Sequence, residues 1–362
     1  MIDAPTHTPM TLDLNHLSAW QYDLPQELIA SRPASRRDDA RLMVVDRASQ
    51  SIRHHSIRDL PDLLQPGDRL VFNNTQVLPA RLFGYRTATK GRWEGLFLGQ
   101  PQTGLWRITG QTRGKLQTGE SITLHPPGEE SPSLCLNLKE RLEDGSWLVR
   151  PDADGDPVEL LHQFGTLPLP PYLGRIVADD TDRDRYQTVF AERPGAIAAP
   201  TAGLHFTSSL LEDLAARQIA QSHVTLHVGI GTFRPVNTEK LSDHRMHSEW
   251  CELTAEAAAA ITHTRTSDSR IVAVGTTSVR TLESACSRGR LAAYQGPTDL
   301  FIQPDYDFEV VDLLLTNFHL PGSTLIVLVA ALAGYDLVME AYRVAVEQRY
   351  RFYSYGDAML IV

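Results

Sequence analysis

The chain has 362 residues, of which 42% are hydrophobic and 22% are charged, and its formal net charge is −10. This composition is typical of a soluble protein with enough residues for two domains, and the acidic charge argues against a general nucleic-acid binder. Three widely spaced cysteines, and an N-terminus without a basic and apolar signal, predict a cytoplasmic protein without a disulfide framework.

The acidic chain contains two locally basic segments. Residues 31–58 carry seven arginines against three aspartates, and residues 68–153 carry eleven lysines and arginines against nine acids. Such segments are solvated charged faces or surfaces for an anionic partner, and charge alone favours the first interpretation. The longest wholly apolar run, residues 325–333, falls short of the roughly 20 residues of a membrane span, so it predicts a buried helix and no membrane partner.

The middle of the chain differs from its flanks. Seven short strand-like runs, from Leu70–Phe72 to Trp147–Val149, alternate with Gly, Pro and polar residues, which predicts a small all-β barrel or sandwich. The following segment predicts a helix at 208–218, strands at 223–228 and 270–275, and helices at 255–264, 277–287, 324–333 and 337–350. This alternation is typical of an α/β fold. The simplest architecture is an α/β domain, residues 1–67 and 154–362, interrupted by an inserted β-barrel domain, residues 68–153.

Four polar loops in the second half of the chain contain most of the chemically useful residues. They are Ala198–Thr207, Leu226–Val236, Ala273–Glu283 and Thr316–Thr324. Each combines glycine with hydroxyl, amide, guanidinium or imidazole side chains, and several of them border a predicted helix start, where backbone N–H groups are free. Four such loops in one half of a chain predict one shared ligand site.

These loops are also part of a family resemblance that runs nearly end to end. Further matched segments are Tyr22–Pro25, Val71–Thr75, Tyr186–Phe190 and Tyr350–Ile361. Through them the chain resembles the S-adenosylmethionine:tRNA ribosyltransferase-isomerases of queuosine biosynthesis. The departures lie mostly between about residues 85 and 180 and in an N-terminal extension. The resemblance implies an α/β domain with an inserted barrel.

The resemblance also implies a reaction. The ribosyl part of S-adenosylmethionine would move to a 7-aminomethyl-7-deazaguanine base in a tRNA anticodon and be rebuilt as epoxyqueuosine, with release of adenine and methionine. S-adenosylmethionine would be a consumed co-substrate, and we expect no metal or redox cofactor because the sulfonium activates its neighbouring carbon. The protein must supply a proton acceptor, orientation and a dry pocket. We expect a monomer that acts on tRNA.

Candidates for proton transfer are the histidines of the matched loops. His205, His227 and His319 can exchange protons near neutral pH, although each could instead be a structural hydrogen-bonding residue. Asp357 and Glu249 are the next candidates. We expect His205 to have the largest effect on rate, because it follows a glycine and precedes a predicted helix start.

Candidates for substrate binding lie in the same loops. Asn317 can hold an adenine edge, and Arg280 can pair with the methionine carboxylate or, equally well, with Glu283 or another acid. Thr276 and Thr277 open a predicted helix, whose N-terminus can bind an anionic group or carry an ordinary cap. The other candidates are Pro200, Thr201, Gly203, Phe206, Gly229, Gly231 and Thr232.

Candidates for RNA contact are arginines and one aromatic residue, since unstacked bases and phosphates favour both. They are Arg36, Arg37, Arg41, Arg81, Arg351 and Tyr353. His244, His247 and Cys251 have a spacing that could bind zinc, but no fourth ligand lies near, so the sequence favours a pocket-shaping or RNA-contacting loop and no metal site.

Two other functional classes compete with the transferase. A non-enzymatic RNA-binding protein would use the barrel as its binding module, but it leaves the four polar loops unexplained. An S-adenosylmethionine-dependent RNA methyltransferase usually has a glycine-rich loop after its first strand, and none occurs early in this chain. Release of adenine and methionine would mark ribosyl transfer, whereas S-adenosylhomocysteine would mark methylation.

Overall fold

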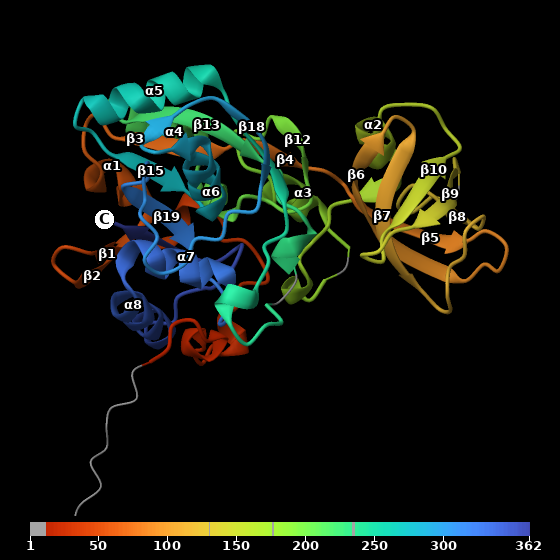
Figure 1. Ribbon diagram of the computed structural model, residues 1–362, viewed down its shortest axis with the longest axis horizontal. Coiled ribbons are helices and arrows are strands. Elements are labelled where there is room, and N and C mark those ends of the chain that lie inside the picture. Colours follow the sequence, from red (N-terminus) through yellow and green to blue (C-terminus); the bar gives the residue numbers. More distant parts are fainter. Residues whose placement is uncertain (1–11, 130, 176, 234–235) are drawn as a thin grey trace, which may run out of the picture.

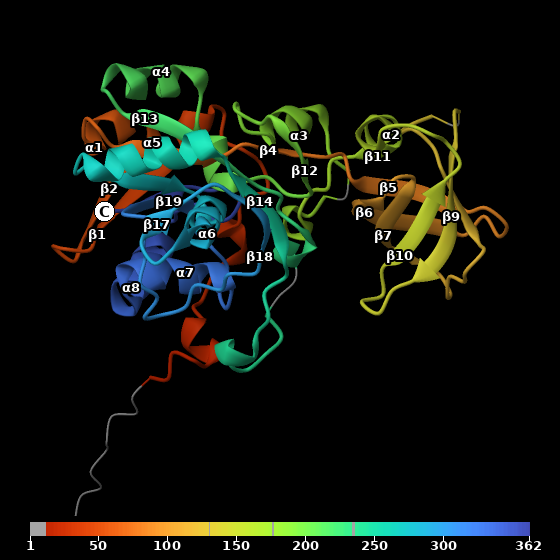
Figure 2. The ribbon, with the colours of Figure 1, turned by 45° about the horizontal axis from the view of Figure 1, so that its top comes forward.

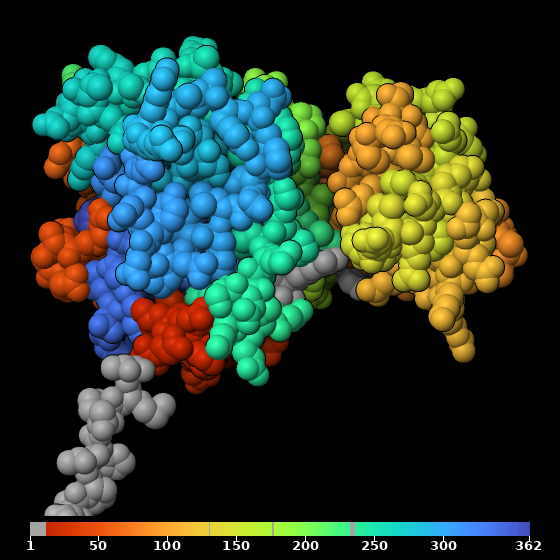
Figure 3. Space-filling model, in the orientation of Figure 1, coloured from red at the N-terminus to blue at the C-terminus, as the bar shows by residue number. Residues whose placement is uncertain are grey.

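The computed structural model describes residues 12–129, 131–175, 177–233 and 236–362. It shows a larger α/β body and a smaller β-barrel joined by a narrow connection (Figure 1). In the space-filling view the barrel forms a separate lobe beside the larger body (Figure 3). The α/β fold with an inserted barrel, expected from the sequence, is confirmed.

A nine-stranded mixed sheet organises the larger body. In spatial order its strands are β18 (Tyr294–Thr298), β14 (Glu249–Leu253), β13 (Ala220–Leu226), β3 (Arg69–Asn73), β15 (Ile271–Val274), β19 (Leu313–Asn317), β20 (Ala358–Ile361), β1 (Arg41–Asp46) and β2 (Ser51–Ser56). The four central strands β13, β3, β15 and β19 run parallel, whereas β20 is antiparallel to β19. The carboxyl ends of these four strands therefore meet at one edge.

Helices cover both faces of this sheet because its central strands are apolar on both faces. The helices of the chain are α1 (Leu60–Leu63), α2 (Pro157–Phe164), α3 (Asp180–Arg185), α4 (Ser208–Ala216), α5 (Ala255–Thr266), α6 (Thr276–Ala285), α7 (Thr324–Ala333) and α8 (Tyr335–Glu347). One core cluster joins the sheet to α5, α6, α7 and α8, and a second joins its other face to α1 and α4. Figure 2 shows α4 and α8 on opposite sides of the sheet.

The smaller lobe is a closed antiparallel barrel. Its strands, in order around the barrel, are β5 (Arg81–Arg86), β6 (Arg92–Gln102), β7 (Leu105–Thr112), β10 (Trp147–Pro151), β9 (Leu134–Arg141) and β8 (Ser121–Leu124). Pairing of β8 with the end of β5 closes it, and β11 (Gly165–Thr166) pairs with the start of β5. Alternate residues fill the interior, including the buried Trp93, Trp106 and Trp147. Two smaller ladders pair β4 (Thr75–Val77) with β12 (Arg193–Ala196), and β16 (Cys286–Ser287) with β17 (Arg290–Leu291).

The strand-like run Leu70–Phe72 was wrongly grouped with the barrel, because it forms β3 at the centre of the main sheet. Val71 packs into one core cluster, and Leu70 and Phe72 pack into the other. A continuous apolar run is typical of a parallel strand that is buried on both faces. The predicted boundary at 68 is therefore too early, because β3 belongs to the main sheet. The boundary at 153 stays a prediction, and the pairing of β5 with β11 leads us to propose an insert between about residues 78 and 166.

Within the described ranges, no single helix is long and apolar enough to cross a membrane. The helices α7 and α8 reach that length and composition only as a pair, and they are bent by 119° relative to each other.

Candidate active site at the carboxyl edge of the central strands

The four polar loops meet at the carboxyl edge of the parallel strands. The first loop contacts the fourth through His205 and Asn317, whose side-chain nitrogens are 3.1 Å apart. It also approaches the third, since a Cβ on Gly275 would lie 3.5 Å from that of Ala202. The second and third loops are joined through Glu249, which contacts both the Gly229 amide and Arg280. In open α/β sheets, ligands bind outside this edge.

His205 is a buried imidazole held by the end of β19. The Asn317 amide nitrogen lies 3.2 Å from the Tyr353 carbonyl and 3.4 Å from the Asp357 carbonyl, and it shares its two hydrogens between these oxygens and His205, which fixes the orientation of the amide. The same nitrogen faces His205 Nε2, so this ring nitrogen is an acceptor and the ring proton lies on Nδ1. Burial lowers the pKa of His205 to about 4. His205 is therefore neutral at pH 7, with its acceptor nitrogen occupied.

Asn317 carries an unsatisfied acceptor. Its side chain is 2% exposed, and its Oδ1 has no hydrogen-bond partner among the described residues. A buried polar atom without a partner costs about 1–3 kcal/mol. The position at the carboxyl edge favours a substrate N–H group as the missing donor, in line with the predicted contact to an adenine edge.

His319 is the second buried imidazole. Its Nε2 lies 2.9 Å from the Thr316 hydroxyl, and its backbone is held by the hydroxyls of Tyr22 and Tyr342. Burial lowers its pKa to about 3. These contacts make His319 a residue that shapes the loop after β19, and they leave Nε2 occupied.

The two buried histidines predict a loss of stability in mild acid. In the unfolded chain an imidazole titrates near 6.5, whereas in the folded protein His205 and His319 titrate near 4 and 3. Between pH 6.5 and 4 the unfolded state binds more protons, so the free energy of unfolding falls as the pH is lowered. We expect these two groups to remove about 3–4 kcal/mol between pH 7 and pH 5.

Denaturant titrations at several pH values test this expectation. The His205→Gln and His319→Gln variants should each lose about 2 kcal/mol less than the unsubstituted protein over the same pH interval. An unchanged pH dependence in both variants would show that the folded protein does not exclude the charged imidazoles.

His227 differs from the other two histidines in being half-buried. Its Nδ1 lies 2.8 Å from the Thr75 hydroxyl, and its ring stacks on Trp250 with centroids 5.0 Å apart and planes at 15°. Gly195 makes room for the ring, because a Cβ there would lie 2.6 Å from it. Burial and, to a smaller extent, Arg193 lower the pKa of His227. Its Nε2 makes no hydrogen bond to any described residue.

Glu249 and Arg280 form a buried ion pair. Their side chains are 9% and 6% exposed, and one guanidinium nitrogen contacts Glu249 Oε2 directly. Glu249 Oε1 accepts from the Gly229 amide at 2.7 Å, and Arg280 also donates to the carbonyls of Leu300 and Thr298. The acid that pairs with Arg280 is therefore Glu249 and not Glu283. Glu283 instead accepts from three backbone amides, those of residues 309–311.

Asp357 is a buried carboxylate with both oxygens in use. They accept from the backbone amides of Arg41 (2.9 Å) and Arg351 (2.8 Å). Burial raises its pKa, while these hydrogen bonds oppose the shift. The geometry favours a structural role, which is to tie the start of β1 to the segment before β20.

The N-terminus of α6 opens directly at the edge. Gly275 precedes it with φ +87°, and no side chain caps the helix. Thr276 is buried, and the Thr277 hydroxyl is a buried atom without a partner among the described residues. Uncapped N–H groups and the helix dipole favour an anionic ligand group here.

The first loop supplies a close-packed wall. Thr201 begins the short helix Thr201–His205, which Pro200 precedes. A Cβ on Gly203 would lie 2.9 Å from Phe190 and Thr188 side chains, and Phe206 is fully buried against Phe72. Gly231 is equally close-packed, against His247. The side chain of Thr232, another predicted binding residue, lies outside the described residues.

The predicted RNA-contacting residues have varied surroundings. Arg36 is 61% exposed and pairs with Asp38, whereas Arg81 pairs with Glu94 in the barrel wall. The other four contact groups of the protein itself. Arg37 donates to the carbonyls of residues 184, 185 and 204, and Arg351 donates to the Arg32 carbonyl. Arg41 lies 3.7 Å over the Tyr350 ring, and Tyr353 packs on Tyr172.

Three nearby residues were not singled out from the sequence. Thr75 orients His227, Trp250 stacks on it, and Arg185 joins Arg36, Arg37 and His205 around a small surface pocket. The Asn73-Asn74-Thr75 sequence, which begins at the last residue of the buried strand β3, was an available signal for Thr75, because polar residues at a carboxyl strand end point to a site. Within the described residues, no group of three His, Cys, Asp or Glu side chains could hold a metal ion.

Comparisons with known proteins agree on one family. A family model described as a queuosine biosynthesis protein matches residues 17–361. The S-adenosylmethionine:tRNA ribosyltransferase-isomerase of Symbiobacterium thermophilum is 49% identical over 96% of this chain and 99% of its own length. Its namesake from Trichlorobacter lovleyi is 47% identical over 95% and 98%. A crystal structure of S-adenosylmethionine tRNA ribosyltransferase from Thermotoga maritima is 37% identical, covers 95% of this chain and all of its own, and has a TM-score of 0.55.

Proposed function

Because the chain belongs to the queuosine biosynthesis protein family, it is a transferase that moves and isomerises the ribosyl group of S-adenosylmethionine onto tRNA, and we propose that its acceptor is 7-aminomethyl-7-deazaguanine in the anticodon. The product is then epoxyqueuosine in tRNA, with adenine and methionine released. The observation that supports this site most strongly is the meeting of the four polar loops at one carboxyl edge.

We assign proton abstraction to His227. The carbon next to the sulfonium of S-adenosylmethionine is acidic, and a neutral imidazole with a free Nε2 can accept its proton. This role requires the ring proton on Nδ1, where it is donated to the Thr75 hydroxyl, and this hydrogen bond also orients the ring. His205, Asp357 and Glu249 have their acceptor atoms occupied, and burial makes His319 a weak base with a pKa of about 3, so we assign these four residues to holding the loops in place.

The methionine and adenine parts of S-adenosylmethionine each have a suitable partner at the carboxyl edge of the sheet. The uncapped start of α6, at Thr276 and Thr277, suits the methionine carboxylate. The unpartnered Oδ1 of Asn317 suits an amino group such as that of adenine. Arg280 acts indirectly, since its pairing with Glu249 fixes the Gly229 amide beside the site.

Product analysis tests the proposal. Incubation with S-adenosylmethionine and tRNA that carries 7-aminomethyl-7-deazaguanine should release adenine and methionine in equal amounts, and turnover should persist after exhaustive chelation. Unmodified tRNA is the matched control and should release neither. Formation of S-adenosylhomocysteine would replace the proposal with methylation, and zinc-dependent recovery would reopen the zinc interpretation of His244, His247 and Cys251.

The remaining expectations stay proposals. We propose that the enzyme acts as a monomer in the cytoplasm, where its tRNA substrate is found, and that S-adenosylmethionine is consumed without a further cofactor. A non-enzymatic RNA-binding role does not account for the orphaned acceptor of Asn317 and the uncapped helix α6 at the same edge.

A further inference from the structure

The outer end of the barrel brings two turns together. Strand β5 runs from Arg81, beside β11, to Arg86, so the turn after it lies at the end far from the connection to the main body (Figures 1 and 2). The loop after β7, residues 113–120, lies next to that turn. The Thr87 amide donates to the Ser121 carbonyl at 2.9 Å, and the Arg86 guanidinium faces the Arg113 carbonyl at 3.4 Å.

This outer end is strongly basic within an acidic protein. Residues 86–92 and 113–120 contain five cations and one acid, Glu120, which pairs with Arg86. The other four, Lys90, Arg92, Arg113 and Lys115, are exposed and have no acidic partner among the described residues. The neighbouring segment 139–144 adds no net charge once the ion pair between Asp144 and Arg107 is included. The end therefore carries a net charge of +4, against −10 for the chain.

Aromatic rings lie beneath this charge. Lys90 Nζ lies 4.5 Å from the Tyr85 ring centroid. Tyr85 stacks on His125 with ring centroids 5.7 Å apart, and its hydroxyl lies 3.3 Å from His125 Nε2. The opposite end of the barrel is acidic instead, with Glu129, Asp152, Asp154, Asp156 and Glu159. The barrel is thus polarised, with its cations directed away from the main body.

We propose that Lys90, Arg92, Arg113 and Lys115 form a tRNA-binding surface that contacts the ribose-phosphate backbone away from the modified base. Lysine and arginine side chains without acidic partners bind phosphates, and they release counterions as they do so. We choose RNA, rather than an anionic lipid or an acidic protein, as the partner because the substrate of the enzyme is a tRNA. The inference therefore rests on the proposed function. The inserted barrel then serves as a second handle on the substrate.

Neutralising the four cations tests the proposal. The K90Q/R92Q/R113Q/K115Q variant should fold normally, since all four side chains are exposed. Its affinity for full-length tRNA should fall at least about tenfold, and the slope of log affinity against log salt should decrease by about 2–4 units. The KM for S-adenosylmethionine should not change.

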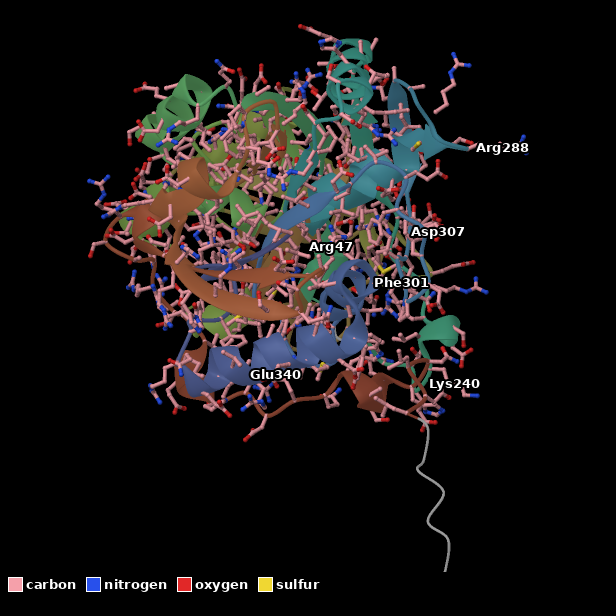
Figure 4. The ribbon with its side chains drawn as sticks, turned by 90° about the vertical axis from the view of Figure 1, so that its left-hand side faces the viewer. Arg47, Lys240, Arg288, Phe301, Asp307 and Glu340 are labelled. Carbon is pink, nitrogen blue, oxygen red and sulfur yellow. The ribbon has the colours of Figure 1, made fainter. Side chains whose placement is uncertain are left out.

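The matched control removes two exposed cations from the main body. Arg288 points into solvent from the turn between β16 and β17 (Figure 4), and Arg290 is exposed at the start of β17. The R288Q/R290Q variant should keep the tRNA salt slope, whereas R92Q/R113Q should lower it by about 1–2 units. An equal slope in R92Q/R113Q and R288Q/R290Q would overturn the proposal.

The test of the barrel surface can be separated from the test of the proposed reaction. Adenine release by the unsubstituted enzyme, measured first, decides the reaction. A normal reaction of the unsubstituted enzyme, together with an unchanged salt slope in the quadruple variant, would contradict only the proposal of an RNA-binding surface on the barrel. A lowered slope without adenine release keeps the surface as an RNA-binding site and removes the reaction. Anionic vesicles of phosphatidylserine, as a second ligand, should not bind, and binding that the quadruple variant abolishes would assign the surface to lipid instead.

Discussion

Replacing Glu249 by alanine will lower the free energy of unfolding by about 3–5 kcal/mol, because it leaves the Arg280 guanidinium buried without its counter-charge. The Gly229 amide also loses its acceptor. Urea unfolding followed by circular dichroism at pH 7.5 measures the change. The large cost arises from desolvation, since the Arg280 side chain is only 6% exposed.

An exposed ion pair provides the control. Glu340 lies on the outer side of α8 (Figure 4), where it pairs with Arg343, and these side chains are 48% and 55% exposed. Glu340→Ala should cost much less than Glu249→Ala, because solvent screens an exposed ion pair. Removing both buried charges in Glu249→Ala/Arg280→Met should recover part of the loss. If Glu249→Ala cost no more than Glu340→Ala, the pair would have to be solvated in the folded protein.

Local sequence patterns predicted most of the α/β body. The helix expected at 324–333 is α7, because nine consecutive apolar residues predict a buried helix, and α4, α5 and α6 begin within one residue of their expected starts. Strand β3 was misplaced because an apolar run of three residues looks the same in a barrel and in a parallel sheet. Only its pairing with β13 and β15, which lie about 150 and 200 residues later in the chain, decides between the barrel and the parallel sheet.

The candidate site was predicted in location but not in the roles of its residues. Loops that follow parallel strands converge for reasons of topology, so the grouping could be expected from the strand pattern. The contacts between individual side chains could not be expected, because Glu249 and Arg280 are 31 residues apart in the chain and Thr75 and His227 are 152 residues apart. Burial of His205 and His319 likewise depends on packing by distant segments, and the sequence alone did not separate them from His227.

We expect His227→Ala to lower kcat by about a hundredfold to ten-thousandfold, with little change in the KM for S-adenosylmethionine. This expectation departs from the choice of His205 on sequence grounds, because a buried imidazole with a pKa of about 4 is a weak base whose Nε2 already faces Asn317. His227 is half-buried, its Nδ1 is oriented by Thr75, and its other nitrogen is free among the described residues. Single-turnover measurements with saturating tRNA report the chemical step.

Two further measurements separate a base from a structural residue. Added imidazole should restore part of the rate of His227→Ala, since the vacated space beside Gly195 borders solvent, but should not restore His319→Ala. Thr75→Val removes only the orienting hydroxyl and should lower kcat less than loss of the ring. If His227→Ala kept nearly full rate while His205→Ala lost it, the proton would have to pass to His205, and the hydrogen bond from Asn317 would have to open during the reaction.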